Sequence, residues 1–154
     1  MDRTVFEARH RPGTAGHRTV PHTADLRVEA WAPTAAGCVA EAVRAVVESF
    51  ADTSGAAATG ERECVVTAPS DDDLLASVLE EVVYRLDADG EIPLDVDVEP
   101  YGSAGGGPGL RVRFRMADAR TARETGAAPK AVALHGLRLR HGPGGWSCGV
   151  TVDV

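Results

Sequence analysis

The sequence predicts a single α+β domain in which two amphipathic helices pack on a largely antiparallel β-sheet. Two segments repeat apolar residues at helical spacing, and several others alternate apolar and polar residues as half-buried strands do. Short turns separate most consecutive strands, which favours antiparallel pairing. A length of 154 residues with 44% hydrophobic residues suits one domain with one core.

The first elements are two short strands. The polar start of the chain predicts a flexible N-terminal segment over residues 1–17, followed by one domain over residues 18–154. Within that domain strands are expected over residues 19–22 and 26–31, the second of which alternates apolar and polar residues. The letters HTAD then lie at a tight connection between these strands.

Two capping residues mark the helix starts. Thr34 can cap a first helix, and Ser70, followed by three aspartates, can cap a second. Each helix has one apolar side, so each is expected to lie on a sheet. The apolar positions are Val39, Ala42, Val43, Val46, Val47 and Phe50 in the first helix, and Leu74, Leu75, Val78, Leu79, Val82, Val83 and Leu86 in the second.

The remaining segments alternate apolar and polar residues and predict strands over residues 64–67, 92–98, 110–116, 131–139 and 146–154. A glycine-rich run, GSAGGGPG, joins two of them, and the turn HGPGG joins the last two. The expected order is therefore β-β-α-β-α-β-β-β-β. Residues 117–129 show no clear period and predict a long mobile loop.

Charge, apolar runs and cysteine content argue against several classes of function. The net charge is −7 and the basic residues are dispersed, so direct nucleic-acid binding is disfavoured. No signal peptide or membrane-length apolar run is present, which predicts a soluble cytosolic protein. Cys38, Cys64 and Cys148 form no CxxC pair and are expected to be small buried hydrophobes.

Common catalytic and ligand-binding motifs are missing. DADGEIPLDVDVE resembles a calcium loop, but aligning Gly90 with the loop glycine puts Arg85 and Val96 at ligand positions. The segment is better explained as a helix end that turns into a strand. There is no GxSxG elbow and no HExxH pair. The candidate functional residues are polar residues near strand ends, namely His22, Asp25, Lys130, His135 and Asp153.

Five blocks, taken in order, resemble the archease family. They are HTADLRVEAW, a helix that ends in SFAD, LLASVLEEVVYRLDADG, KAVALHGL and GGWSCGVTVDV, and they run from about residue 19 to residue 154. The resemblance implies a small cytosolic α+β protein that binds a divalent cation and assists an RtcB-type RNA ligase. It would promote guanylylation and multiple turnover of the ligase in tRNA splicing or RNA repair. It would not be an enzyme itself, and it would meet RNA only through the ligase.

The resemblance also implies a metal site. Its ligands would be Asp25, Asp153 and Val154, the last through its main-chain or terminal oxygens. Oxygen ligands suit a hard cation, so calcium is expected, with magnesium or manganese as alternatives. His22 and Thr23 would fix the turn and support the ligands.

Two further residues are candidates for partner contact. Lys130 and His135 lie in the block KAVALHGL, and Lys130 is the only lysine among 16 basic residues. A lysine ammonium can approach a carboxylate or phosphate as a point charge, which a planar guanidinium cannot imitate. The alternative for Lys130 is a solvated surface lysine.

Two other functions remain open at the level of sequence. One is a small metal-dependent hydrolase in which Asp25 and Asp153 activate a water and His22 acts as base. The other is an interaction module without metal, in which the acidic residues only stabilise the turn.

Overall fold

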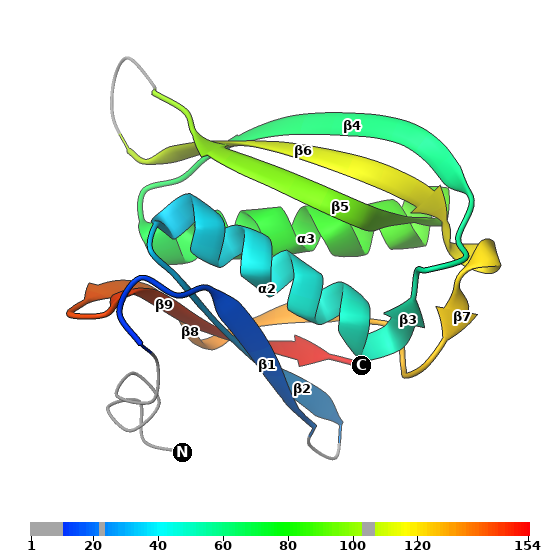
Figure 1. Ribbon diagram of the computed structural model, residues 1–154, viewed down its shortest axis with the longest axis horizontal. Coiled ribbons are helices and arrows are strands. Elements are labelled where there is room, and N and C mark those ends of the chain that lie inside the picture. Colours follow the sequence, from blue (N-terminus) through cyan, green and yellow to red (C-terminus); the bar gives the residue numbers. More distant parts are fainter. Residues whose placement is uncertain (1–10, 22–23, 103–106) are drawn as a thin grey trace.

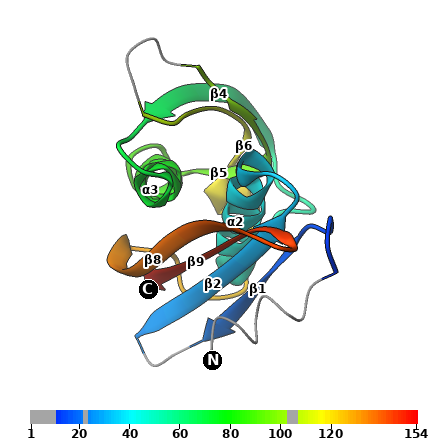
Figure 2. The same cartoon turned by 90° about the vertical axis from the view of Figure 1, so that its left-hand side faces the viewer.

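The computed structural model describes residues 11–21, 24–102 and 107–154. In that part of the chain two α-helices lie between a four-stranded and a three-stranded antiparallel sheet, which gives three layers (Figure 1). Figure 2 shows both helices from the end, with one sheet on either side of them. The predicted α+β class is confirmed, but the strands are divided between two larger sheets, a division that the sequence did not indicate.

Both helices begin where their capping residues predict. Helix α2 spans Ala35–Phe50, and the Thr34 hydroxyl accepts a hydrogen bond from the Gly37 amide at 3.0 Å. Helix α3 spans Asp71–Asp89, and the Ser70 hydroxyl accepts one from the Asp73 amide at 3.2 Å. Local side-chain chemistry is enough to determine both starts, because each cap satisfies an amide of the first helical turn.

Helix α3 ends at Gly90, which has a left-handed backbone with φ 63°. A glycine adopts this conformation without steric cost, and it directs the chain into strand β5, Glu91–Pro100. The calcium-loop interpretation of this segment is therefore rightly rejected.

The four-stranded sheet contains both ends of the described domain. Its order is β1 (Gly16–Pro21), β2 (Asp25–Ala32), β9 (Gly145–Asp153) and β8 (Ala131–Gly142), and all neighbours are antiparallel. Strand β1 begins at Gly16, inside the segment predicted to be flexible. Strand β8 lies at an edge of the sheet and packs beside α3 (Figure 2).

The three-stranded sheet covers the other side of the helices. Its order is β4 (Ala58–Thr67), β6 (Gly109–Asp118) and β5. Strand β4 is longer than the strand predicted over residues 64–67. The prediction missed residues 58–61 because they are exposed and show no apolar alternation. Pairing with β6 extends the strand through this polar stretch.

Residues 117–129 contain regular structure, which corrects the prediction of a long mobile loop. A 3-10 turn forms at Ala119–Thr121, and β7 (Arg123–Glu124) pairs with β3 (Ala51–Asp52). The Thr125 amide then donates to the Phe50 carbonyl at 2.9 Å. Elements of two or three residues carry no periodicity, so the sequence could not indicate them.

The core lies between the sheets and consists of the apolar helix faces and the inward strand residues. Val28, Val150, Phe114 and Met116 are almost fully buried. Cys38 and Cys148 are buried as expected, whereas Cys64 is half-buried.

The chemistry of Cys38 follows from its buried position. Its hydrogen bond to the Cys148 thiol, together with burial, raises its pKa, which favours the unreactive thiol over the thiolate. Among the described residues, no helix is long and apolar enough to cross a membrane.

Candidate metal centre at the end of the chain

Asp25 and Asp153 are brought together by the pairing of β2 with β9. They are direct partners in the register of these antiparallel strands. Directly opposite residues project from the same face of a sheet, with Cβ atoms about 5 Å apart. The next pair, Leu26 and Val152, projects from the other face, where Val152 is buried against the helices. The two aspartates therefore lie on the face that turns away from the core.

The last residue is held at the same end of the sheet. The Val154 amide donates to the Ala24 carbonyl at 3.5 Å, just before β2 begins. The Lys130 amide donates to the Asp153 carbonyl at 2.7 Å, just before β8 begins. The end of the chain is thus fixed between two strands, and three of the predicted site residues, Asp25, Asp153 and Val154, meet there.

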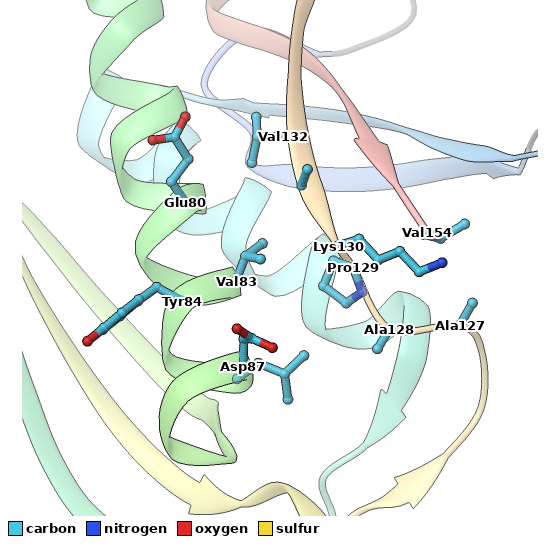
Figure 3. A pocket seen from close by; sticks show the side chains of 12 residues that line it. Glu80, Val83, Tyr84, Asp87, Ala127, Ala128, Pro129, Lys130, Val132 and Val154 are labelled. Carbon is cyan, nitrogen blue, oxygen red and sulfur yellow. The ribbon is translucent and has the colours of Figure 1, made fainter.

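Lys130 lies beside this chain end. Figure 3 shows Lys130 and Val154 next to each other across a cleft from helix α3, with the Lys130 side chain extending away from that helix. Lys130 is exposed, and no hydrogen bond or ion pair of its side chain is found within the described residues. Its ammonium group is therefore available at the same edge as the acidic pair.

His135 lies farther away, in an irregular part of β8. Strand β8 has four residues, 134–137, where β9 has only Val150, so these residues bulge from the ladder. Val150 is three residues from Asp153, roughly 10 Å along the strand. His135 is therefore not brought to the acidic pair. His22 and Thr23 lie outside the described residues.

Arg27 is a neighbour of the acidic pair that sequence reasoning missed. It projects from the same face, two residues along β2 from Asp25. Its guanidinium donates to the Gly136 carbonyl in the bulge at 3.2 Å and to the Thr151 hydroxyl at 3.4 Å. The alternation of β2 could have placed Arg27 on the Asp25 face, but its partners in β8 depend on tertiary structure.

Arg27 reaches the bulge by crossing over Gly149. A Cβ atom at that position would lie 2.2 Å from the Arg27 Nη2 atom. The glycine therefore leaves room for the guanidinium, which connects the strand of Asp25 with the bulge that carries His135.

The donor set suits a hard cation. The carboxylates of Asp25 and Asp153 and the main-chain oxygen of Val154 are all oxygen donors, which calcium and magnesium prefer. Within residues 11–21, 24–102 and 107–154, no three histidine, cysteine, aspartate or glutamate side chains are grouped to hold a metal. The aspartate pair thus needs oxygens of Val154, other backbone oxygens or water to complete a coordination shell.

Comparison with known sequences gives one consistent family. A sequence model of the archease protein family (MTH1598/TM1083) matches residues 17–154. The chain is 51% identical over 145 residues to a probable protein archease from Mycobacterium tuberculosis, covering 94% of this chain and 78% of that protein. It is 29% identical over 141 residues to the protein archease of Archaeoglobus fulgidus, covering 90% and 98%.

Two solved structures have a similar fold. The solution structure of protein 1598 from Methanobacterium thermoautotrophicum matches with a TM-score of 0.75 and 23% identity, over 90% of this chain and 99% of that chain. The crystal structure of an archease and possible chaperone from Thermotoga maritima matches with a TM-score of 0.60 and 19% identity, over 88% and 94%. At these identities the likeness establishes the fold.

Proposed function

This chain belongs to the archease family, and on that premise we propose that it is a divalent-metal-binding accessory protein of an RtcB-type RNA ligase. It promotes guanylylation and multiple turnover of the ligase in tRNA splicing or RNA repair. It acts in the cytoplasm, meets RNA only through the ligase and catalyses no ligation itself. The description of the Thermotoga maritima relative as a possible chaperone agrees with action on another protein.

The observation that carries this proposal is the acidic pair beside the chain end. Asp25 and Asp153 face each other across β2 and β9, and Val154 is tied to Ala24 next to them. These three residues would hold the cation, with calcium preferred and magnesium or manganese as alternatives. When bound, the cation would supply positive charge between the two carboxylates.

Lys130 has a separate role in this proposal. The Lys130 amide donates a hydrogen bond to the Asp153 carbonyl. Lys130 therefore fixes the backbone of one proposed metal ligand. The ammonium then contacts a carboxylate or phosphate group at the nucleotide-bound site of the ligase. Metal binding and partner contact therefore meet at one edge of the protein.

A guanylylation assay tests the proposal. The cognate ligase is incubated with GTP, metal and RNA ends, with this protein at substoichiometric amounts. Wild-type protein should raise both the guanylylated fraction and the number of ligations per ligase. Asp25→Asn and Asp153→Asn should lose most of this stimulation, because each removes one anionic ligand.

A control variant and a second assay separate this function from its alternatives. Asp97→Asn changes an exposed aspartate on the three-stranded sheet and should stimulate as wild type does. The same preparations are assayed with phosphate esters in the absence of ligase. Turnover that Asp25→Asn abolishes would support a metal-dependent hydrolase instead.

A further inference from the structure

A large open cleft lies between α3 and the start of β8 (Figure 3). Its volume is about 980 Å³, and it opens to solvent. Apolar side chains form its floor, with Val83 and Leu86 from the helix and Val132 from the strand. These side chains are only half-buried, so the floor retains apolar surface that a partner could cover.

The helix side of the cleft is acidic. Glu80, Tyr84 and Asp87 are spaced by four and three residues, so they share one face of α3. All three are exposed, and Tyr84 retains 57% of its accessible surface. Figure 3 shows Glu80 and Asp87 along the helix beside the cleft, with the Tyr84 ring extending to the side of the helix away from β8.

The two carboxylates of this face have no partner within the described residues. No hydrogen bond or ion pair joins Glu80 or Asp87 to another described side chain. On the same helix Glu81 and Asp89 both bind Arg85, at 2.8 and 3.1 Å. The acidic residues that face the cleft therefore differ from their neighbours, whose charges are compensated within the protein.

The opposite wall of the cleft is the start of an edge strand. Farther along β8, the Leu139 amide donates to Asp72 of α3 at 2.8 Å, so the helix closes the strand edge there. At Ala131 and Val132 the strand borders the cleft instead. An extended segment of another protein could lie along this part of the strand, as peptides do at open sheet edges.

We propose that this cleft is the docking site for an extended partner segment that carries lysine or arginine next to apolar side chains. Its apolar side chains would cover the floor, and its cations would pair with Glu80 and Asp87. The carboxylates disfavour an anionic ligand such as a nucleotide or RNA at the same place. Lys130, the cation of the opposite wall, extends away from α3 and leaves the acidic side open (Figure 3). In taking the RNA ligase as the partner, the inference rests on the proposed function.

A charge-reversal experiment with the ligase tests the docking site. The double variant Glu80→Lys/Asp87→Lys should bind the cognate ligase about tenfold more weakly than wild type, with a smaller dependence on salt. Its calcium affinity should be unchanged, because the aspartate pair lies on the other face of the sheet. The matched control Glu61→Lys/Asp97→Lys carries the same charge change on the outer face of the three-stranded sheet and should bind as wild type does.

A peptide titration makes the test independent of the ligase. The blocked peptide Lys-Leu-Arg-Val-Lys is added to the full-length ¹⁵N-labelled protein, with Glu-Leu-Glu-Val-Glu as its acidic counterpart. Saturable shifts should be confined to amides of residues 80–87, 127–132 and 154, and only the basic peptide should cause them. No saturable shift there, or equal shifts with the acidic peptide, would overturn the docking site.

The two measurements separate failure of the docking site from failure of the proposed function. If wild-type protein stimulates the ligase but the double variant binds it equally well, the docking proposal is overturned and the function stands. If wild-type protein neither binds nor stimulates the ligase, the function fails, and the peptide titration alone decides whether the cleft accepts a basic segment.

Discussion

Asp25 and Asp153 are direct cross-strand partners, although they lie near opposite ends of the domain's sequence. Their meeting depends on the register of β2 against β9. If one strand slipped by one residue against the other, its side chains would change faces. Its aspartate would then point towards the core, where the adjacent apolar residue now lies. The burial of Val152 and Val28 opposes such a slip, so the packing that stabilises the sheet also positions the acidic pair.

Asp153→Asn should separate metal binding from stability. In chelator the exposed variant should differ from wild type by no more than about 0.5 kcal/mol in the free energy of unfolding. Removing one of the two negative charges that face each other should slightly stabilise the variant. With excess calcium the melting temperature of wild type should rise, whereas that of the variant should stay unchanged, because ligand binding stabilises only the form that binds.

Thermal unfolding in chelator and in calcium measures both quantities, with Asp97→Asn as the control for loss of an exposed aspartate. A calcium-dependent increase in melting temperature equal to that of wild type in both Asp25→Asn and Asp153→Asn would rule out the proposed ligands.

Lys130→Arg should impair stimulation of the ligase more than it impairs calcium binding. The substitution retains the positive charge but replaces a compact ammonium with a planar group that hydrogen-bonds in a different geometry. We expect weaker stimulation of ligase guanylylation at limiting protein, with calcium affinity unchanged by calorimetry. Lys130→Met, which removes the charge, should stimulate still less. Full stimulation by both variants would identify Lys130 as a solvated surface residue.

The parts of the fold that could be predicted are those that depend on local chemistry. Thr34 and Ser70 satisfy amides within their own helices, and Gly90 ends α3 through its own backbone conformation. The alternation of β2 and β9 likewise records which residues face the core. Such signals are contained within a few consecutive residues, so the sequence shows them directly.

The parts that could not be predicted depend on pairing between distant segments. No pattern near Asp25 indicates that it faces Asp153; that expectation came from resemblance to a family. Nothing near Arg27 indicates that it crosses Gly149 to reach Gly136. Division of the strands into two sheets is likewise decided by packing against both sides of the helices.

Gly149→Ala should destabilise the fold by displacing the Arg27 side chain. The new Cβ atom would displace the guanidinium, which then loses its hydrogen bonds to Gly136 and Thr151. We expect a loss of about 1 kcal/mol in the free energy of unfolding. In an Arg27→Ala background the conflict is absent, and alanine is favoured over glycine in a strand, so the same substitution should be neutral or stabilising.

Urea denaturation of the two single variants and the double variant measures this coupling. Additive effects would show that Arg27 does not lie over Gly149 in solution.

Gly126→Ala tests whether residues 117–129 are docked. A Cβ atom at Gly126 would lie 2.3 Å from the Ser49 carbonyl oxygen near the end of α2. A backbone atom in a helix cannot move aside as the end of a side chain can, so we expect a loss of about 1–3 kcal/mol. Gly55→Ala is the matched control, because no atom lies within 4 Å of the added group. Equal stability of the two variants would show that this segment does not pack against α2 in solution.

Extension of the chain beyond Val154 tests the last proposed ligand. Two added residues replace the terminal carboxylate with a neutral amide carbonyl, next to the point where the Val154 amide is bound to Ala24. A carbonyl can still bind calcium, but affinity depends on the number of charged ligands, so calcium binding should weaken. The same two residues added before Met1 provide the control, and the unfolding of both proteins in chelator shows whether the extension has disturbed the fold. Equal calcium affinity in the two proteins would show that the terminal carboxylate is not a ligand. Asp25 and Asp153 would then hold the cation with backbone oxygens and water.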